Sequence, residues 1–108
     1  MTQQPPDRRF ETRHSASARG VVVAPGLELP CLIVDQSAGG LRIRLDRSFA
    51  LTGDVIVIDL SRAMAIECRV AWNKGLEVGL KQSGQTSLRG LVPSRLAAAR
   101  EAFRRAGG

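Results

Sequence analysis

Apolar and polar residues alternate along most of the middle of the chain. In the segment 41–45, three apolar residues are separated by two arginines, and the segments 66–72 and 76–81 show the same period of two. Successive side chains of a β-strand point to opposite faces of the sheet, so this alternation predicts strands with one buried and one exposed face. The pattern therefore favours an all-β fold.

Turn-forming residues separate the predicted strands and keep their connections short. Pro25-Gly26 and Gly53-Asp54 mark two of these turns, and Asn73-Lys74-Gly75 joins the last two strands as a hairpin. The first strand ends in the β-branched run Val21-Val22-Val23, which favours strand structure. The predicted strands lie within 14–24 and at 29–34, 41–45, 55–60, 66–72 and 76–81.

These short strands, with no helix among them, predict a six-stranded antiparallel barrel or a sandwich. We expect Gln82–Ser87 to be a polar linker, and a helix to follow from Pro93-Ser94 to about Ala106, with Gly107 as its stop. One face of this helix is apolar, with Leu96, Ala99 and Phe103, and the other carries Arg95, Arg100, Arg104 and Arg105.

The length of 108 residues predicts one domain. Its expected parts are a flexible N-terminal tail at 1–8, the barrel at 9–82, and the linker and C-terminal helix at 83–108. No apolar run is long enough to cross a bilayer, and the N-terminus lacks the apolar core of a signal peptide. We therefore expect a cytoplasmic protein with no membrane insertion.

Three residue types that often carry chemistry have simpler explanations here. Cys31 and Cys68 lie far apart in strand-like segments, and the chain has one histidine, so we expect buried thiols and no metal site. Trp72 falls on the apolar face of its strand, which favours packing in the core or at the barrel rim over stacking on a base.

The net charge of +6 and the sequence pI of about 11.0 favour an anionic partner. Arginine supplies 14 of the 16 basic residues. Its planar fork matches phosphates and guanine edges, so this bias mildly favours nucleotide recognition.

Three arginines stand close together near the N-terminus, at Arg8, Arg9 and Arg13. An arginine can hold a phosphate through two parallel hydrogen bonds, address the O6/N7 edge of guanine, or lie flat on a base. Taken alone, such a cluster is more often a solvated group of charges than a site.

The turn Asp35-Gln36-Ser37-Ala38-Gly39-Gly40 offers complementary groups. A carboxylate accepts hydrogen bonds from the paired donors on the Watson–Crick edge of guanine, and a hydroxyl can donate or accept. Glycines let a ligand approach the backbone. Taken alone, the same residues are ordinary turn formers.

Together, in this order and among these strands, the two stretches resemble the signature of the PilZ domain family, which is RxxxR followed by (D/N)xSxxG. Arg9-Phe10-Glu11-Thr12-Arg13 and the Asp35–Gly40 turn match both halves without substitution. Val70-Ala71-Trp72 and the segment 77–81 resemble further parts of the family, whereas Gln82 stands where the family usually has phenylalanine.

The resemblance implies a β-barrel that binds cyclic di-GMP, a bacterial second messenger with two guanines and two phosphate charges. It assigns phosphate and guanine contacts to Arg9 and Arg13. It also implies a base pocket lined by Asp35, Ser37, Gly39 and Gly40. Arg8 is a candidate for covering an extra guanine if a stacked pair of ligands binds.

We therefore expect a receptor without catalytic residues, cofactor or metal. Ligand binding is expected to change the conformation of the N-terminal arginine segment and to signal to an unidentified effector protein, in control of motility, attachment or exopolysaccharide production. One alternative is a ligand-independent adaptor of the same fold. Another is a basic barrel that binds nucleic acid, but the chain has few aromatic residues and no tyrosine, so DNA and RNA are not expected partners.

Overall fold

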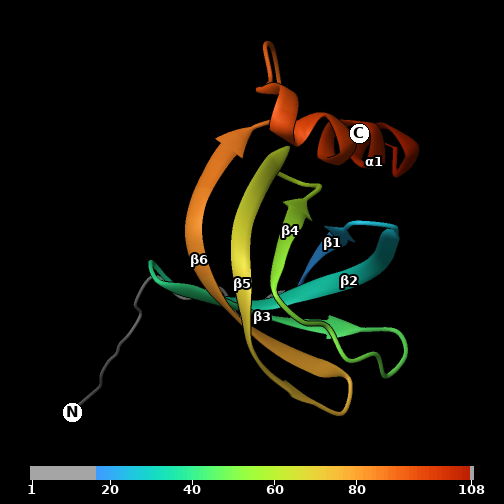
Figure 1. Ribbon diagram of the computed structural model, residues 1–108, viewed down its shortest axis with the longest axis vertical. Coiled ribbons are helices and arrows are strands. Elements are labelled where there is room, and N and C mark those ends of the chain that lie inside the picture. Colours follow the sequence, from blue (N-terminus) through green and yellow to red (C-terminus); the bar gives the residue numbers. More distant parts are fainter. Residues whose placement is uncertain (1–16, 108) are drawn as a thin grey trace, which may run out of the picture.

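The computed structural model describes residues 17–107 and shows a closed barrel of six antiparallel strands with a C-terminal helix packed on it (Figure 1). The strands are β1 (Ala18–Ala24), β2 (Leu27–Gln36), β3 (Gly40–Leu45), β4 (Asp54–Asp59), β5 (Met64–Lys74) and β6 (Glu77–Ser87). A 3-10 turn, η2 (Ser94–Leu96), leads into α1 (Ala97–Arg105). The predicted barrel and C-terminal helix are confirmed, whereas the predicted N-terminal arm lies outside the described residues.

The strand order around the barrel is β1-β2-β3-β6-β5-β4, and the pairing of β1 with β4 closes it. Most neighbours are consecutive in the chain and pair as antiparallel hairpins. The pairing of β3 with β6 is different, because it joins strands that are far apart in sequence. It places Gly40 opposite Lys81 and so brings the turn between β2 and β3 beside β6.

The predicted alternation separates the interior of the barrel from its surface. In β3 the residues Leu41, Ile43 and Leu45 are buried, and the two arginines between them are exposed. Cys31 and Cys68 belong to the interior cluster as free thiols, as expected. Burial raises the pKa of each thiol to about 12, so both stay protonated near neutral pH.

The hairpin of β5 and β6 is longer than the sequence predicts. Gln82–Ser87, predicted to be a linker, instead continues β6 and pairs with the first part of β5, so that Ser87 lies opposite Met64. Backbone groups make these bonds, and the polar side chains of this segment alternate between partly buried and exposed positions. Because neither face of this segment is deeply buried, the strand needs no apolar alternation.

The helix α1 packs on the outer surface of the barrel, across β1 and β4 (Figure 1). Leu96, Ala99 and Ala102 are fully buried there against apolar residues of the barrel wall, namely Val21, Ile58, Ala65 and Leu88. The predicted apolar face is therefore confirmed, with Phe103 partly buried beside it. The helix ends before Gly107, whose φ of 99° suits a glycine.

The turn between β4 and β5 is built around a buried carboxylate. Asp59 is 3% exposed and accepts hydrogen bonds from the Ser61 hydroxyl at 2.7 Å and the Arg62 Nε at 2.9 Å. The Asp59 Oδ1 also accepts hydrogen bonds from the backbone N–H groups of Ser61 and Arg62, with N···O distances of 3.1 and 3.3 Å. Burial alone would raise the pKa of Asp59, but these hydrogen bonds outweigh it and lower that pKa below its usual value.

Candidate functional site

The segment Asp35–Gly40, predicted as a turn, has Asp35 and Gln36 at the end of β2 and Gly40 at the start of β3, so the turn itself is residues 37–39. Backbone hydrogen bonds hold the segment to its surroundings. The Ser37 N–H donates to the Gly40 carbonyl at 2.9 Å, which closes the turn. The Gln82 N–H donates to the Gly39 carbonyl at 3.0 Å, which ties the turn to β6. The pairing register of β2 with β3 shifts between Ile33 and Asp35, as at a β-bulge. Such a shift changes where the following side chains point, and here it falls at the start of the predicted motif.

Asp35 lies beside an arginine on the neighbouring strand. Arg42 of β3 pairs across from Asp35, and its Nη2 is 4.0 Å from the Asp35 Oδ2. The Nη1 of the same guanidinium donates to the Glu77 Oε1 at 3.3 Å. Arg42 therefore links a motif carboxylate to the start of β6, on the outer surface of the barrel.

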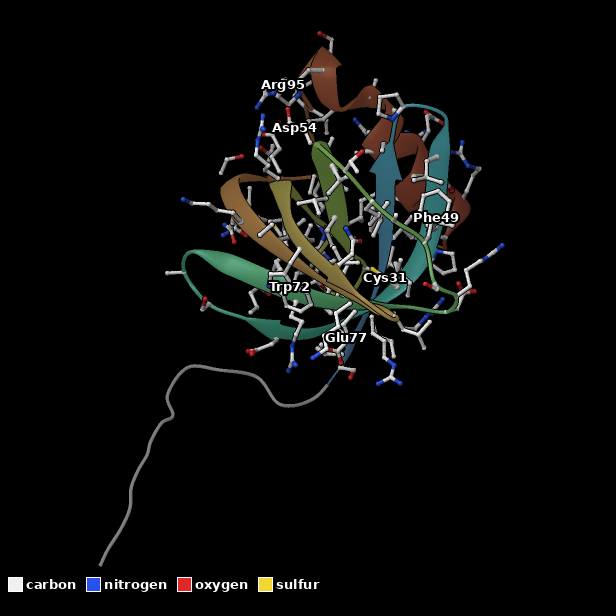
Figure 2. All side chains as sticks on the ribbon, turned by 60° about the horizontal axis from the view of Figure 1, so that its bottom comes forward. Cys31, Phe49, Asp54, Trp72, Glu77 and Arg95 are labelled. Atoms are coloured by element: carbon white, nitrogen blue, oxygen red, sulfur yellow. The ribbon has the colours of Figure 1, made fainter. Side chains whose placement is uncertain are left out.

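Trp72 lies at the surface of the barrel and outside its core. The pairing of β5 with β6 shifts register between Val70 and Trp72, so the alternation that predicted an inward side chain breaks at this point. Trp72 is 43% exposed and lies over Gly79 of β6, where any Cβ would collide with the indole Nε1. Figure 2 shows Trp72 and Glu77 on the same side of the barrel, away from Arg95. The prediction of rim packing holds against Gly79, but the indole is not part of the core.

The motif turn and Trp72 share one surface hollow of about 410 Å³, here called the Trp72 hollow. Its walls include Asp35, Gln36, Ser37, Gly39 and Gly40 from the turn, with Arg42, Trp72, Gly79 and Lys81 from the adjacent strands. The hollow thus combines an aromatic ring, a carboxylate, a hydroxyl, two cations and glycine backbone. A planar heteroaromatic ring that carries both hydrogen-bond donors and an anionic group matches this set.

The structure brings together four of the predicted site residues, Asp35, Ser37, Gly39 and Gly40. The other three, Arg8, Arg9 and Arg13, lie outside the described residues, so their predicted contacts stay predictions. Sequence reasoning did not place Arg42 or Lys81 in the site, and it assigned Trp72 to packing and not to contact with a base. The motif identified the turn, but Arg42 reaches it through its pairing with Asp35 across β2 and β3, and Lys81 and Trp72 reach it through the pairing of β3 with β6 and of β6 with β5.

Within residues 17–107, the structure shows neither a cluster of metal ligands nor a helix that could span a membrane. No group of three or more histidine, cysteine, aspartate or glutamate side chains in this part of the chain could hold a metal ion. Within the same residues, no helix has the length and apolar character needed to cross a membrane.

The family model described as PilZ domain matches residues 7–92 of this chain. The matched region runs from the arginine stretch to the loop before η2, and so contains both halves of the predicted motif and all six strands. Comparisons with curated proteins and with solved structures give no match.

Proposed function

Because this chain belongs to the PilZ domain family, whose domains act as cyclic di-GMP receptors, we propose that it binds cyclic di-GMP and acts as a ligand-gated adaptor. The observation that carries the proposal is the Trp72 hollow, which Asp35 and Ser37 of the motif line together with an exposed indole. Such a site can hydrogen-bond one guanine edge and cover one guanine face.

Each part of the hollow has a role in this proposal. The Asp35 carboxylate accepts hydrogen bonds from the paired N–H donors of guanine, and the Ser37 hydroxyl contacts the same base. Arg9 and Arg13 hold phosphate and guanine from the open side, with Arg8 available for a second, stacked ligand. Arg42 and Lys81 add positive charge at the wall of the hollow, which favours the approach of a dianionic ligand.

The proposal is tested by isothermal titration of cyclic di-GMP into the wild-type protein and into Arg9→Ala. The wild type is expected to bind at micromolar concentration or tighter. Arg9→Ala should weaken binding by roughly 10- to 100-fold, because a charge-assisted hydrogen-bonding pair is lost. The control is Arg47→Ala, which removes the same charge from an exposed side chain whose ion pair, among residues 17–107, is with its neighbour Asp46.

The outcomes separate the alternatives. If the wild type gives no binding heat, the receptor proposal is wrong and a ligand-independent adaptor is favoured. If Arg9→Ala and Arg47→Ala both bind like the wild type, the assignment of Arg9 is wrong. Two ligands per chain would support the role of Arg8, and one would contradict it. Steeply salt-dependent binding to DNA or RNA instead would favour the nucleic-acid alternative.

We also infer that ligand binding fixes the arginine segment over the Trp72 hollow and so creates a new surface for an effector protein. A ligand held between Asp35 and the forks of Arg9 and Arg13 joins the two halves of the motif, and the arginine segment loses freedom on binding. The backbone ¹⁵N relaxation of residues 1–13 should therefore approach that of the barrel when cyclic di-GMP is added. Unchanged relaxation with saturating ligand would contradict this switch.

A further inference from the structure

A second hollow lies on the other side of the motif turn. It measures about 980 Å³ and is here called the Arg62 hollow. Asp35, Gln36 and Ser37 line it as well as the Trp72 hollow, so these three residues form a wall between the two. The opposite side of the Arg62 hollow is formed by the start of β1, including Arg19, and by the turn from Asp59 to Arg62. The ligand contacts proposed above for Asp35 and Ser37 all lie on the side of the Trp72 hollow.

Arg62 is held in a fixed orientation at the edge of this second hollow. Its Nε donates to the Asp59 Oδ2 at 2.9 Å, and its Nη2 donates to the Gln36 Oε1 at 3.4 Å. The Asp59 side chain is 5% exposed and is fixed in turn by the Ser61 hydroxyl, whereas the Arg62 side chain is 48% exposed. Because the guanidinium is already oriented, binding a ligand costs it little further conformational entropy.

The charge that this arrangement presents to the hollow is positive. Asp59 lies behind the guanidinium and is nearly inaccessible, so Arg62 provides the exposed part of the pair. Arg19 lines the same hollow. Asp35 also lines it, but its Oδ2 is directed to Arg42, at 4.0 Å. A guanidinium has five N–H donors, and Arg62 uses two of them in the bonds to Asp59 and Gln36.

A ligand with two equivalent halves fits a wall with a hollow on each side. Cyclic di-GMP has two guanines joined through two phosphates, so a guanine placed against Asp35 and Trp72 leaves the rest of the ring to extend past Ser37. Arginine forks match the paired oxygens of a phosphate. Resting on the proposed function above, we propose that the ligand spans the Asp35–Ser37 wall and places a phosphate on Arg62, which makes the Arg62 hollow a second part of the same site.

The test is isothermal titration of cyclic di-GMP into Arg62→Ala and Arg62→Gln. Gln is included because its side-chain amide can still donate a hydrogen bond to Asp59, so this variant keeps the turn folded if the alanine variant does not. Both variants should bind about tenfold more weakly than the wild type, because a charge-assisted contact is lost. Arg47→Ala, with the same change in net charge, should bind within about twofold of the wild type, since its contact is exposed and remote.

A further variant separates direct contact from positioning. Gln36→Ala removes the Arg62–Gln36 hydrogen bond but leaves the guanidinium bound to Asp59. If Arg62 contacts the ligand, Gln36→Ala should cost much less affinity than Arg62→Gln. If the two variants lose equal affinity, Arg62 acts by holding the motif turn, and the proposed phosphate contact is wrong.

The remaining outcomes distinguish this inference from the proposed function. If Arg62→Gln binds like the wild type while Arg9→Ala does not, the second part of the site is excluded and the receptor function stands. If the wild type itself does not bind cyclic di-GMP, the receptor function fails and this inference fails with it. A reduced salt dependence of the dissociation constant in Arg62→Gln, compared with Arg47→Ala, would independently support an ionic contact.

Discussion

Gly39 and Gly40 stand next to each other in the motif but meet different surroundings. A Cβ on Gly40 would lie 2.8 Å from the backbone carbonyl oxygen of Leu80, because β3 approaches β6 closely at this point. A Cβ on Gly39 would meet nothing within 4 Å. Neither has the positive φ that only a glycine adopts easily. Gly40 is therefore required by the barrel itself, whereas Gly39 is open for a ligand to approach.

This difference predicts separate effects on stability and on binding. Gly40→Ala should lower the free energy of unfolding by about 1–3 kcal/mol, because a backbone contact must shift. Gly39→Ala should change that free energy by less than about 0.5 kcal/mol, since its site is exposed. If the ligand approaches this backbone, Gly39→Ala should still weaken binding of cyclic di-GMP. Urea unfolding and titration on both variants check this, and equal losses of stability would contradict it.

A single carboxylate gives the protein a defined response to acid. The folded-state pKa of Asp59 is lowered, so its ionised form stabilises the fold. That contribution is complete above the unfolded-state pKa of about 3.9, and it is lost as the pH falls through the lower folded-state pKa. Asp59→Asn should therefore be less stable than the wild type at pH 7, by about 2 kcal/mol, because buried donors lose a charged acceptor.

The difference between the wild type and Asp59→Asn should shrink as the pH falls below about 4. Urea unfolding measured from neutral to strongly acidic pH checks this. The control is Asp46→Asn, which changes an exposed carboxylate whose ion pair within the described part of the chain is with its neighbour Arg47. It should change the unfolding free energy by less than about 0.5 kcal/mol at neutral pH. A difference for Asp59→Asn that stays constant at all pH values would show that ionisation is not the cause.

At the scale of elements, α1 and the barrel have separate apolar clusters. The interior cluster is formed by the inward residues of the six strands, whereas α1 packs against outward residues of β1, β4 and β5. Small side chains at Ala99 and Ala102 let the helix lie close to the wall, and Leu96 is fully buried at its start. Two ion pairs add to this attachment, Arg105 with Glu28 and Arg95 with Glu67. These pairs are exposed, so the apolar contact supplies most of the stabilisation.

Two leucines close together in sequence test this attachment. Leu96 is 0% exposed, whereas Leu91, in the loop before η2, is fully exposed. Leu96→Ala should lower the free energy of unfolding by about 2–4 kcal/mol, because it removes buried methyl groups and leaves a cavity. Leu91→Ala should change it by less than about 0.5 kcal/mol. Equal effects in chemical denaturation would show that the docked helix does not stabilise the fold.

At the scale of the whole molecule, the sequence predicts those strands and turns whose characteristic residues lie close together in the chain. The alternation in β3 and the hairpin turn at Gly75 each lie within a few residues, and both are found where they were predicted. The strand over Gln82–Ser87 was not predicted, because its pairing with β5 is made by the backbone and does not require an alternation of apolar and polar side chains. The apolar alternation stops short of these residues.

In the candidate site, too, the sequence predicts what nearby residues determine and misses what strand pairing determines. The Asp35–Gly40 turn was found because its motif is contiguous. The exposed position of Trp72 depends on a register shift within the β5–β6 pair, and the place of Arg42 depends on β3 lying between β2 and β6. Arg62 reaches Gln36 only because the barrel closes through β1 and β4. Arg42 and Trp72 are placed by the register of hairpins between consecutive strands, and Arg62 by the pairing of the more distant β1 and β4. No local sequence pattern records these registers.

Closure of the barrel also limits how another protein can recognise this one. Each of the six described strands already has a neighbour on both sides, because β4 pairs with β1. A partner that binds by adding its own strand needs an unpaired edge of backbone donors and acceptors. Where a described strand is paired on both sides, the barrel offers no such edge, whereas residues 83–87 of β6 are paired with β5 alone. Over the doubly paired part of the barrel, a partner protein would have to recognise side chains and surface shape, and a bound ligand would alter these features.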